Sequence, residues 1–130
     1  MKTITVRLAR PYDILIEAGV LARAGEYIRN TLGHCRVMVV TDDTVRALYG
    51  DALLTSLNEA GLDAVEFVIP HGEASKSTAS LIDLLNTLAE NAFTRTDIVC
   101  ALGGGVVGDL AGFAAAVYLR GIRYVGIPTT

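Results

Sequence analysis

The sequence has no tryptophan, three prolines and only two cysteines among its 130 residues. Cys35 and Cys100 lie far apart, inside apolar runs and without the close spacing of metal ligands, which indicates buried free thiols rather than a disulfide or a zinc site. Charge is also sparse, because 11 basic and 14 acidic residues give a net charge of −3 with no long run of either sign. This balance excludes the basic surface of a nucleic-acid-binding protein, and the free thiols favour the reducing cytoplasm.

Export and membrane signals are missing as well. The first eleven residues alternate polar and apolar side chains instead of forming the apolar block of a secretory signal. The 21 residues Val99–Leu119 carry one charge, and Gly108 and Gly112 match the G-x-x-x-G spacing of membrane helices. Three adjacent glycines at about 1 kcal/mol each, and Asp109 at roughly 2.5–3.5 kcal/mol, argue against such a helix. We therefore expect a water-soluble strand, turn and helix over this stretch.

Apolar residues are abundant, at 52% of the chain, which is enough for one domain with its own core. Their spacing predicts two short N-terminal strands, at 4–8 and 14–16, that pair as a hairpin. Further along it predicts helices at 20–32, 45–57, 77–91 and 108–120, and strands at 36–41, 65–69, 97–102 and 124–128. The inner faces expected for the second and fourth helices are Val45, Leu48, Tyr49, Ala52, Leu53 and Leu57, and Leu110, Phe113, Ala114 and Val117.

Strands and helices alternate strictly from Arg36 onward. This order predicts an α/β fold: a Rossmann-like, mainly parallel sheet with helices on both faces and the short N-terminal strands at its edge. Ligands of such sheets bind at the carboxyl ends of the strands. The segments that follow those ends, where we expect the functional site, are Thr41–Thr44, Pro70–Lys76, Gly103–Asp109 and Pro128–Thr130.

The third of these segments carries the most informative motif. Gly103, Gly105 and Gly108 fit the spacing G-x-G-x-x-G between an apolar strand and a helix. Glycines there let the backbone turn tightly and let an anion reach the amides of a helix N-terminus, which indicates a phosphate or pyrophosphate site. A tight strand-to-helix connection without a ligand is the simpler alternative. No acid follows Asp109, so an ordinary dinucleotide fingerprint is incomplete.

Four charged residues near this turn have two interpretations each. Asp42 either accepts hydrogen bonds from a ribose or caps the following helix, and Asp109 either contacts a ligand or stabilises the first helical turn. Lys76 starts a helix, where a cation opposes the helix dipole, so it either meets an anionic ligand or is solvated. Glu73, in the same loop, either hydrogen-bonds a sugar or lies in water.

The other polar candidates have simpler structural explanations. His34 and His71 share no acid and no ligand spacing, so we interpret them as ordinary loop residues. Arg120 and the following glycine suit the end of helix 108–120, as a partner of the helix dipole and as its cap. Thr129 and Thr130 place two hydroxyl groups at the carboxyl end of a strand.

The stretch ALGGGVVGDLAGFAAAVYLRGIRYVGIPTT at Ala101–Thr130 closely resembles the corresponding part of the 3-dehydroquinate synthases. The upstream stretches VVTDDTV and IPHGEASKS resemble that family too, in the same order and at similar separations. The resemblance covers essentially the whole chain, but only the amino-terminal, nucleotide-binding part of the family's enzyme. It implies a single NAD-binding α/β domain at residues 1–130, without the family's helical C-terminal domain for metal and substrate, and thus a truncated or excised domain.

The resemblance implies the chemistry of a cytoplasmic lyase of the shikimate pathway, which serves aromatic amino acid biosynthesis. That enzyme uses NAD and a divalent metal, zinc or cobalt, to convert the seven-carbon phosphate DAHP into 3-dehydroquinate and phosphate, and it recycles NAD within each turnover. A homodimer is also implied. The family's metal-binding Glu and His and its catalytic lysines lie beyond Thr130. We therefore expect no metal ligand and no synthase activity in this chain alone.

Residue by residue, the resemblance assigns Asp42 to the adenosine side of NAD, and Thr129 and Thr130 to the nicotinamide side. Asp109 also borders the substrate, and Arg120 reaches the substrate phosphate of a neighbouring subunit. The further NAD contacts that it implies are His71, Gly72, Glu73 and Lys76 in the loop, and Gly104, Gly105, Val106, Val107, Gly108 and Asp109 in the turn. His71 and Ala74-Ser75 replace the family's usual Asp and Gln-Tyr, so only the backbone role of that loop carries over unchanged.

Two other hypotheses remain open. A related sugar phosphate cyclase, or a glycerol-dehydrogenase-like enzyme, shares the same nucleotide turn. A stand-alone nucleotide-binding module without chemistry is the other alternative.

Overall fold

The computed structural model describes residues 1–130, and a four-stranded parallel sheet forms its centre. The strands lie in the order β4-β3-β5-β6, with bounds of Ala64–Ile69, Val37–Asp42, Ile98–Gly103 and Arg123–Pro128. The two inner strands, β3 and β5, are buried on both faces, as their continuous apolar runs predict. Burial alternates along the edge strands β4 and β6. All four predicted strands are confirmed to within one residue at each end.

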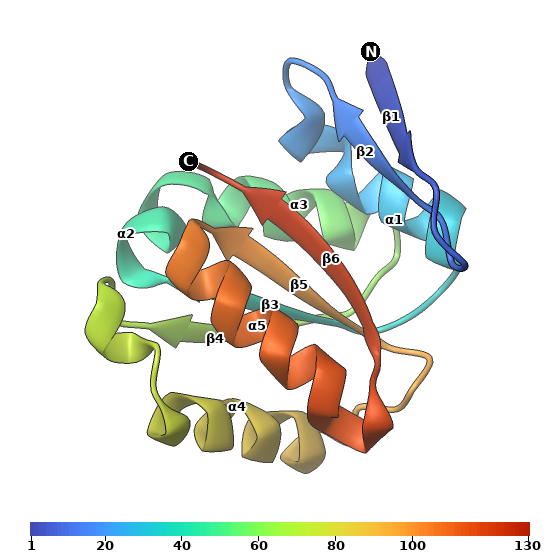
Figure 1. The fold of residues 1–130 in the computed structure, drawn as a ribbon. Coiled ribbons are helices and arrows are strands. Elements are labelled where there is room, and N and C mark those ends of the chain that lie inside the picture. The colour runs from blue at the N-terminus through green and yellow to red at the C-terminus, as the bar shows by residue number, and fades with distance from the viewer.

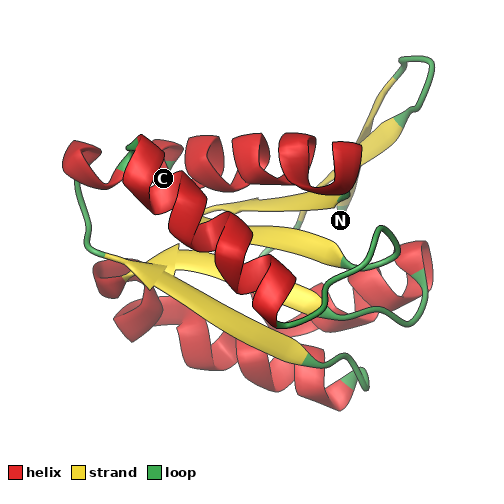
Figure 2. Cartoon of the chain, turned by 90° about the horizontal axis from the view of Figure 1, so that it is seen from below, coloured by secondary structure: helices red, strands yellow, loops and turns green.

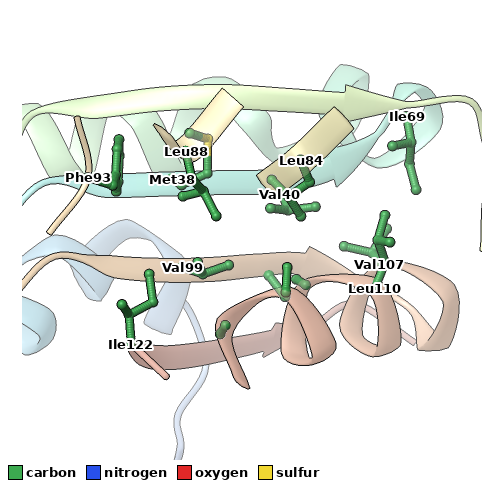
Figure 3. Close-up of a cluster of buried hydrophobic side chains, with 14 residues drawn as sticks. Met38, Val40, Ile69, Leu84, Leu88, Phe93, Val99, Val107, Leu110 and Ile122 are labelled. Atoms are coloured by element: carbon green, nitrogen blue, oxygen red, sulfur yellow. The ribbon is translucent and has the colours of Figure 1, made fainter. Parts of the chain in front are cut away.

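Helices cover both faces of this sheet (Figure 2). α1 at Ala24–Leu32 and α3 at Asp51–Glu59 pack on one face. α4 at Thr78–Glu90 and α5 at Gly105–Val117 pack on the other, where leucines of α4 lie beside Met38 and Val40 of β3 (Figure 3). The predicted Rossmann-like α/β fold is therefore confirmed. None of the helices combines the length and the apolar content that crossing a membrane requires.

The N-terminal strands pair with each other but not with the main sheet. β1 at Lys2–Val6 and β2 at Tyr12–Ile16 form a separate antiparallel sheet, and the prediction that they lie at the edge of the parallel sheet is wrong. After β2 the chain turns at Gly19, whose φ is 75°, and enters the 3-10 turn η1 at Val20–Arg23 and then α1. The chain therefore enters the helices that cover one face of the sheet directly after the hairpin. The hairpin itself projects beyond these helices (Figure 1).

A π-helical turn changes the buried face of the helix after β3. α2 at Asp43–Val45 runs through the π turn η2 at Arg46–Gly50 into α3. Leu53 and Leu57 are buried as predicted, but Leu48 and Tyr49 are 67% and 41% exposed, and Ala52 is also exposed. The π turn adds a residue, so the residues within and before it are rotated about the axis relative to those that follow, and an uninterrupted 3.6-residue period assigns the wrong face to Leu48 and Tyr49.

α5 begins three residues earlier than predicted, at Gly105, and ends at Val117. Leu110 and Ala114 are buried as predicted, whereas Phe113 and Val117 are 57% and 44% exposed. The buried face instead consists of Val107, Leu110, Ala111, Ala114 and Ala115. Its three alanines let the helix lie close to β5 and β6, which explains why small rather than large side chains line this contact.

The end of α5 also differs from the prediction of a glycine-capped helix. The 3-10 turn η4 at Tyr118–Arg120 follows it, and Leu119 and Arg120 have φ values of 49° and 65°. Two consecutive non-glycine residues with positive φ are uncommon and strained. Arg120 therefore lies outside α5 and does not act as a partner of that helix's dipole.

Candidate functional site

The carboxyl ends of the parallel strands form one edge of the molecule. Asp42 and Gly103 end the neighbouring strands β3 and β5, one step beyond the paired Thr41 and Leu102. From β3 the chain crosses outward to β4 and then returns to β5 on the other side of β3, so the strand order reverses between β3 and β5. Such a reversal opens a crevice for ligands outside the strand ends. The four predicted segments lie together at this edge, on the left of Figure 1.

The glycine turn leads from β5 directly into α5. A Cβ on Gly103 would lie 2.9 Å from Cβ of Val107, and one on Gly104 would lie 3.1 Å from Oγ1 of Thr130. A Cβ on Gly105 would meet nothing within 4 Å. Packing therefore explains the first two glycines but not the third. The open space at Gly105 is where a ligand can approach the backbone.

The N-terminus of α5 has no cap. Its N-cap residue is Gly104, which has no side chain to accept a hydrogen bond. The first amide of the helix that donates a hydrogen bond within it is that of Gly108, to the Gly104 carbonyl at 3.0 Å. The amides of Gly105, Val106 and Val107 thus have no partner within the helix. Val107 is only 1% exposed and its side chain belongs to the core, so Gly105 and Val106 form the accessible part of this terminus. Free amides at the positive end of a 13-residue helix are the donors that an anion needs, which makes this terminus a candidate anion site.

Asp109 lies in the second turn of α5 rather than the first, because the helix starts at Gly105. The dipole interaction falls off within the first turn, so it does not account for this carboxylate. Instead, Oδ2 of Asp109 lies 3.3 Å from Nζ of Lys76, which is also 3.5 Å from Oε2 of Glu73. The hydrogen bond to Asp109 and the charge of Glu73 raise the pKa of Lys76.

The loop after β4 carries Lys76 to this position. Gly72 adopts a φ of 105°, which favours glycine, and the short 3-10 turn η3 follows at Glu73–Ser75. The Ser75 hydroxyl donates to the Pro70 carbonyl at 2.5 Å and holds the loop in a closed turn. Ser77 then caps α4 by accepting a hydrogen bond from the Ser80 amide at 3.2 Å.

The acids after β3 have different partners. Oδ1 of Asp42 accepts a hydrogen bond from the Val45 amide at 2.7 Å, so the capping interpretation holds for that oxygen. Oδ1 of Asp43 accepts from the His71 amide at 3.0 Å and lies 2.8 Å from the His71 ring nitrogen Nδ1. The hydrogen bond raises the pKa of His71 and lowers the pKa of Asp43. The interpretation of His71 as a loop residue without an acid is therefore wrong.

The threonine pair closes the edge beside the glycine turn. The Thr129 amide donates to the Gly103 carbonyl at 3.2 Å, and the Thr129 hydroxyl oxygen is buried without a hydrogen-bond partner. The Thr130 hydroxyl lies against Gly104. Two hydroxyl groups, one of them unpaired, thus stand next to the free amides of α5.

Most of the predicted site residues are brought together, and one, Arg120, is not. Asp42, the loop 71–76, the turn 104–109 and the threonine pair surround the strand ends. Arg120 lies beyond the far end of α5, about 20 Å away for a 13-residue helix. His34 follows α1 at the opposite, amino end of β3. Sequence reasoning missed Asp43, although its place at a strand end was a signal.

Cys35 and Cys100 are free and buried, as expected. No three or more His, Cys, Asp or Glu side chains gather where they hold a metal ion. The edge offers backbone hydrogen-bond donors at the start of α5, with carboxylates and hydroxyls around them.

Known proteins share this sequence and fold. The family model described as 3-dehydroquinate synthase N-terminal matches residues 66–130. The 3-dehydroquinate synthase of Rhodospirillum rubrum is 51% identical over 128 residues, which are 98% of this chain and 33% of the relative. That of Streptococcus suis is 44% identical over 128 residues, 98% of this chain and 36% of the relative. The chain thus spans about a third of the length of the curated relatives that it matches.

Solved structures give the same grouping. A 2-epi-5-epi-valiolone synthase from Streptomyces hygroscopicus, with NAD+ and Zn2+ bound, superposes with a TM-score of 0.79 at 31% identity, over 98% of this chain and 35% of that one. A 2-deoxy-scyllo-inosose synthase in complex with carbaglucose-6-phosphate, NAD+ and Co2+ gives 0.88 at 22% identity, over 99% of this chain and 35% of that one, and shows the shared fold. With the family model matching half of the chain, the protein belongs to the 3-dehydroquinate synthase family, in its amino-terminal region.

Proposed function

We propose that residues 1–130 form the NAD-binding domain of a 3-dehydroquinate synthase, with the NAD pyrophosphate at the N-terminus of α5. The observation that carries this proposal is the open space at Gly105 beside the free amides of Gly105, Val106 and Val107. A phosphate group supplies the acceptors that these amides lack. The solved 2-epi-5-epi-valiolone synthase, a relative at 31% identity, holds NAD+ and supports this choice of ligand.

The remaining residues of the edge suit the other parts of NAD. Asp42 uses Oδ1 to cap α2, and its Oδ2 is left to accept hydrogen bonds from the adenosine ribose. The Thr129 hydroxyl is buried and unpaired, so a donor or acceptor of the nicotinamide half satisfies it. When bound, NAD would supply a reversible hydride acceptor for the oxidation of a substrate hydroxyl. The protein binds and orients the two halves.

Lys76 lowers the electrostatic cost of placing a pyrophosphate here. Without it, the Asp109 carboxylate on the second turn of α5 would repel the phosphate groups. The Lys76 ammonium lies 3.3 Å from Asp109 and is 44% exposed, so it neutralises that carboxylate while it stays accessible to a ligand. Gly72 and Glu73 then contribute loop contacts, with Glu73 also paired to Lys76.

The substrate and the whole reaction belong to the longer enzyme. We infer from the curated relatives that it converts DAHP into 3-dehydroquinate and phosphate with a divalent metal, zinc or cobalt, and acts as a homodimer. In it Asp109 borders the substrate, and Arg120 reaches the substrate phosphate of a neighbouring subunit. The metal ligands and catalytic lysines of the family fall outside the matched third. We expect no phosphate release from DAHP by residues 1–130 alone, and measured turnover would contradict this.

A second candidate is another sugar phosphate cyclase, because the 2-epi-5-epi-valiolone synthase is 31% identical over nearly the whole chain. The two candidates share the NAD site and differ in the sugar phosphate that is cyclised. Offering the full-length enzyme DAHP and a second sugar phosphate side by side separates them. Turnover of DAHP alone supports the synthase, and turnover of the other sugar alone contradicts it.

The NAD proposal has a sharp test in two glycines of α5. Calorimetric titration with NAD compares the unchanged chain with Gly105→Ala and Gly112→Ala. A Cβ at Gly105 touches nothing in the protein, and one at Gly112 meets only the Tyr124 ring at 4.0 Å, so both variants fold. We expect Gly105→Ala to weaken NAD binding about tenfold or more, because its methyl group fills the space of the phosphate. Equal affinities of both variants, or no NAD binding by the unchanged chain, would overturn the proposal.

A further inference from the structure

A hydrogen-bonded bridge joins the loop after β4 to the end of β3. Oδ1 of Asp43 accepts a hydrogen bond from the His71 amide at 3.0 Å and lies 2.8 Å from Nδ1 of the same residue's ring. The two residues are 28 positions apart in the sequence, but β3 and β4 pair in parallel register, with Asp42 opposite Ile69. The bridge therefore connects two of the segments that border the proposed NAD site.

Acidic groups outnumber basic groups at this edge of the sheet. The acids that end or follow the strands are Asp42, Asp43, Glu73 and Asp109, and the bases are His71 and Lys76. Both bases belong to the loop after β4, and each lies against an acid of another segment. Lys76 lies 3.3 Å from Asp109 of α5, and His71 contacts the acid after β3 in the same way. A bound pyrophosphate adds further negative charge, so these two pairs reduce the repulsion that it meets.

The two basic groups respond differently to pH. The pKa of Lys76 is raised above that of an ordinary lysine, so its ammonium group stays charged across the neutral range. The hydrogen bond to Asp43, and the charges of Asp43 and Asp42, raise the pKa of His71 from 6.5, and a histidine ring exchanges its proton near neutral pH. The other charged groups of this edge pair with one another and not with the ring: Glu73, Lys76 and Asp109. One of the two compensating charges is therefore lost at alkaline pH.

Loss of this charge does not release the loop. The His71 amide donates to Asp43 whether or not the ring is protonated, so the net charge beside the NAD site is what changes. Asp43 directly follows β3, the neighbour of β5, and thus lies on the order of 10 Å from the glycine turn. The side chains of His71 and Asp43 are 70% and 53% exposed, so water and salt limit the effect on affinity to a few-fold.

We propose that the His71 ring makes NAD binding pH-dependent, because it neutralises Asp43 when protonated and leaves that carboxylate to repel the pyrophosphate when neutral. The inference rests on the NAD-binding function proposed above. It concerns this chain's own residue, since the family's usual residue at position 71 is Asp, which cannot carry a positive charge. By linkage, NAD binding favours the protonated ring, so binding near the pKa of His71 takes up protons.

Calorimetric titration with NAD at constant ionic strength, from pH 5.5 to 8.5, measures this coupling. The unchanged chain should bind NAD about threefold more weakly at pH 8.5 than at pH 5.5. His71→Asn has no charge and should show the weaker affinity at every pH, whereas His71→Lys keeps the charge and should hold the tighter affinity throughout. Both variants retain the amide that anchors the loop. His34→Asn, at the other histidine, is the matched control and should keep the pH profile of the unchanged chain.

Two further readouts separate the charge of the bridge from a structural role. Asp43→Asn removes the repelling charge but keeps a side-chain oxygen for the His71 amide. It should therefore bind NAD at pH 8.5 at least as tightly as the unchanged chain does at pH 5.5, whereas a purely structural bridge predicts weaker binding. Saturation with NAD should also raise the pKa of His71 further, as measured from the titration of its ring signals by NMR.

The inference fails if the unchanged chain binds NAD equally at both ends of the pH range, if His71→Asn keeps its pH profile, or if Asp43→Asn weakens binding. These outcomes leave the NAD site itself in place. An absence of NAD binding at every pH overturns the NAD site and this inference together. Gly105→Ala tells the two apart, because it should weaken NAD binding by the same factor at every pH.

Discussion

The ammonium group of Lys76 lies 3.3 Å from Oδ2 of Asp109, and this contact joins the loop after β4 to the second turn of α5. The two residues are 33 positions apart in the sequence. A cation near the start of α4 opposes the dipole of that helix. The Asp109 carboxylate of α5 offsets this unfavourable interaction by pairing with Lys76. This pairing also leaves a partly exposed ammonium group beside the free amides that we propose bind phosphate.

Replacing Lys76 tests its role at the NAD site. Lys76→Ala should weaken NAD binding about tenfold, because a charge-assisted contact to the pyrophosphate is lost and Asp109 becomes unshielded. The melting temperature should stay the same, since both partners are largely exposed. Calorimetry and thermal denaturation measure the two effects. Lys2→Ala, at the only other lysine, is the matched control and should change neither.

The Asp43–His71 pair predicts a pH dependence of stability. The hydrogen bond to Asp43 raises the pKa of His71 above its ordinary value of 6.5, so the stabilisation is complete below that value and is lost as pH rises through the folded pKa. The pKa of Asp43 is lowered from 3.8, so its contribution is lost only as pH falls below that value. The pair is therefore most stabilising between about pH 4 and 6.5.

Thermal denaturation of the unchanged chain and of His71→Asn from pH 4 to 8 measures this contribution. The difference in melting temperature between them should be larger at pH 5.5 than at pH 8. His34→Asn, at the other histidine, should show a difference that does not vary in this way. A constant difference for His71→Asn would contradict the assigned pair.

Gly25 allows α1 to lie close against α3. A Cβ there would lie 2.2 Å from the Ser56 carbonyl oxygen, and the Gly25 amide donates to the Ser56 hydroxyl at 2.9 Å. Gly25→Ala must push α1 from α3, so it should destabilise the protein by about 1–3 kcal/mol. Chemical denaturation measures this change. Gly112→Ala, which has room for its methyl group, should instead stabilise by up to about 1 kcal/mol.

The two thiols should be unreactive in the folded protein. Burial raises the pKa of Cys100 to about 12, and Cys35 is only 4% exposed. A thiolate is needed for attack on a disulfide reagent, so neither residue should react at pH 8 until the chain unfolds. Titration with Ellman's reagent with and without denaturant counts the accessible thiols. Fast reaction of one thiol in native buffer would contradict the burial of that residue.

Local patterns were reliable where one period or one strong motif governed an element. The runs that became β3 and β5 were apolar throughout, and only a strand buried on both faces suits them. The local sequence patterns failed where the periodicity of a helix is interrupted. The π turn at Arg46–Gly50 rotated Leu48 outward, and no residue type marks such a turn in advance. The predicted helix begins at Gly108, three residues late. Glycine has a low helix propensity, yet α5 already begins at Gly105 within the glycine turn.

The sequence by itself determined the alternation of strands and helices, the glycine turn and the family, because each depends on residues that are neighbours or near neighbours along the chain. Only the tertiary structure decided which distant side chains meet. It paired Lys76 with Asp109 and His71 with Asp43, and it brought Arg10, Arg95 and Arg120 together from the hairpin, a loop and a turn. Such contacts follow from the strand order and the crossover connections, which bring distant loops together at one edge of a sheet. No local sequence pattern predicts them.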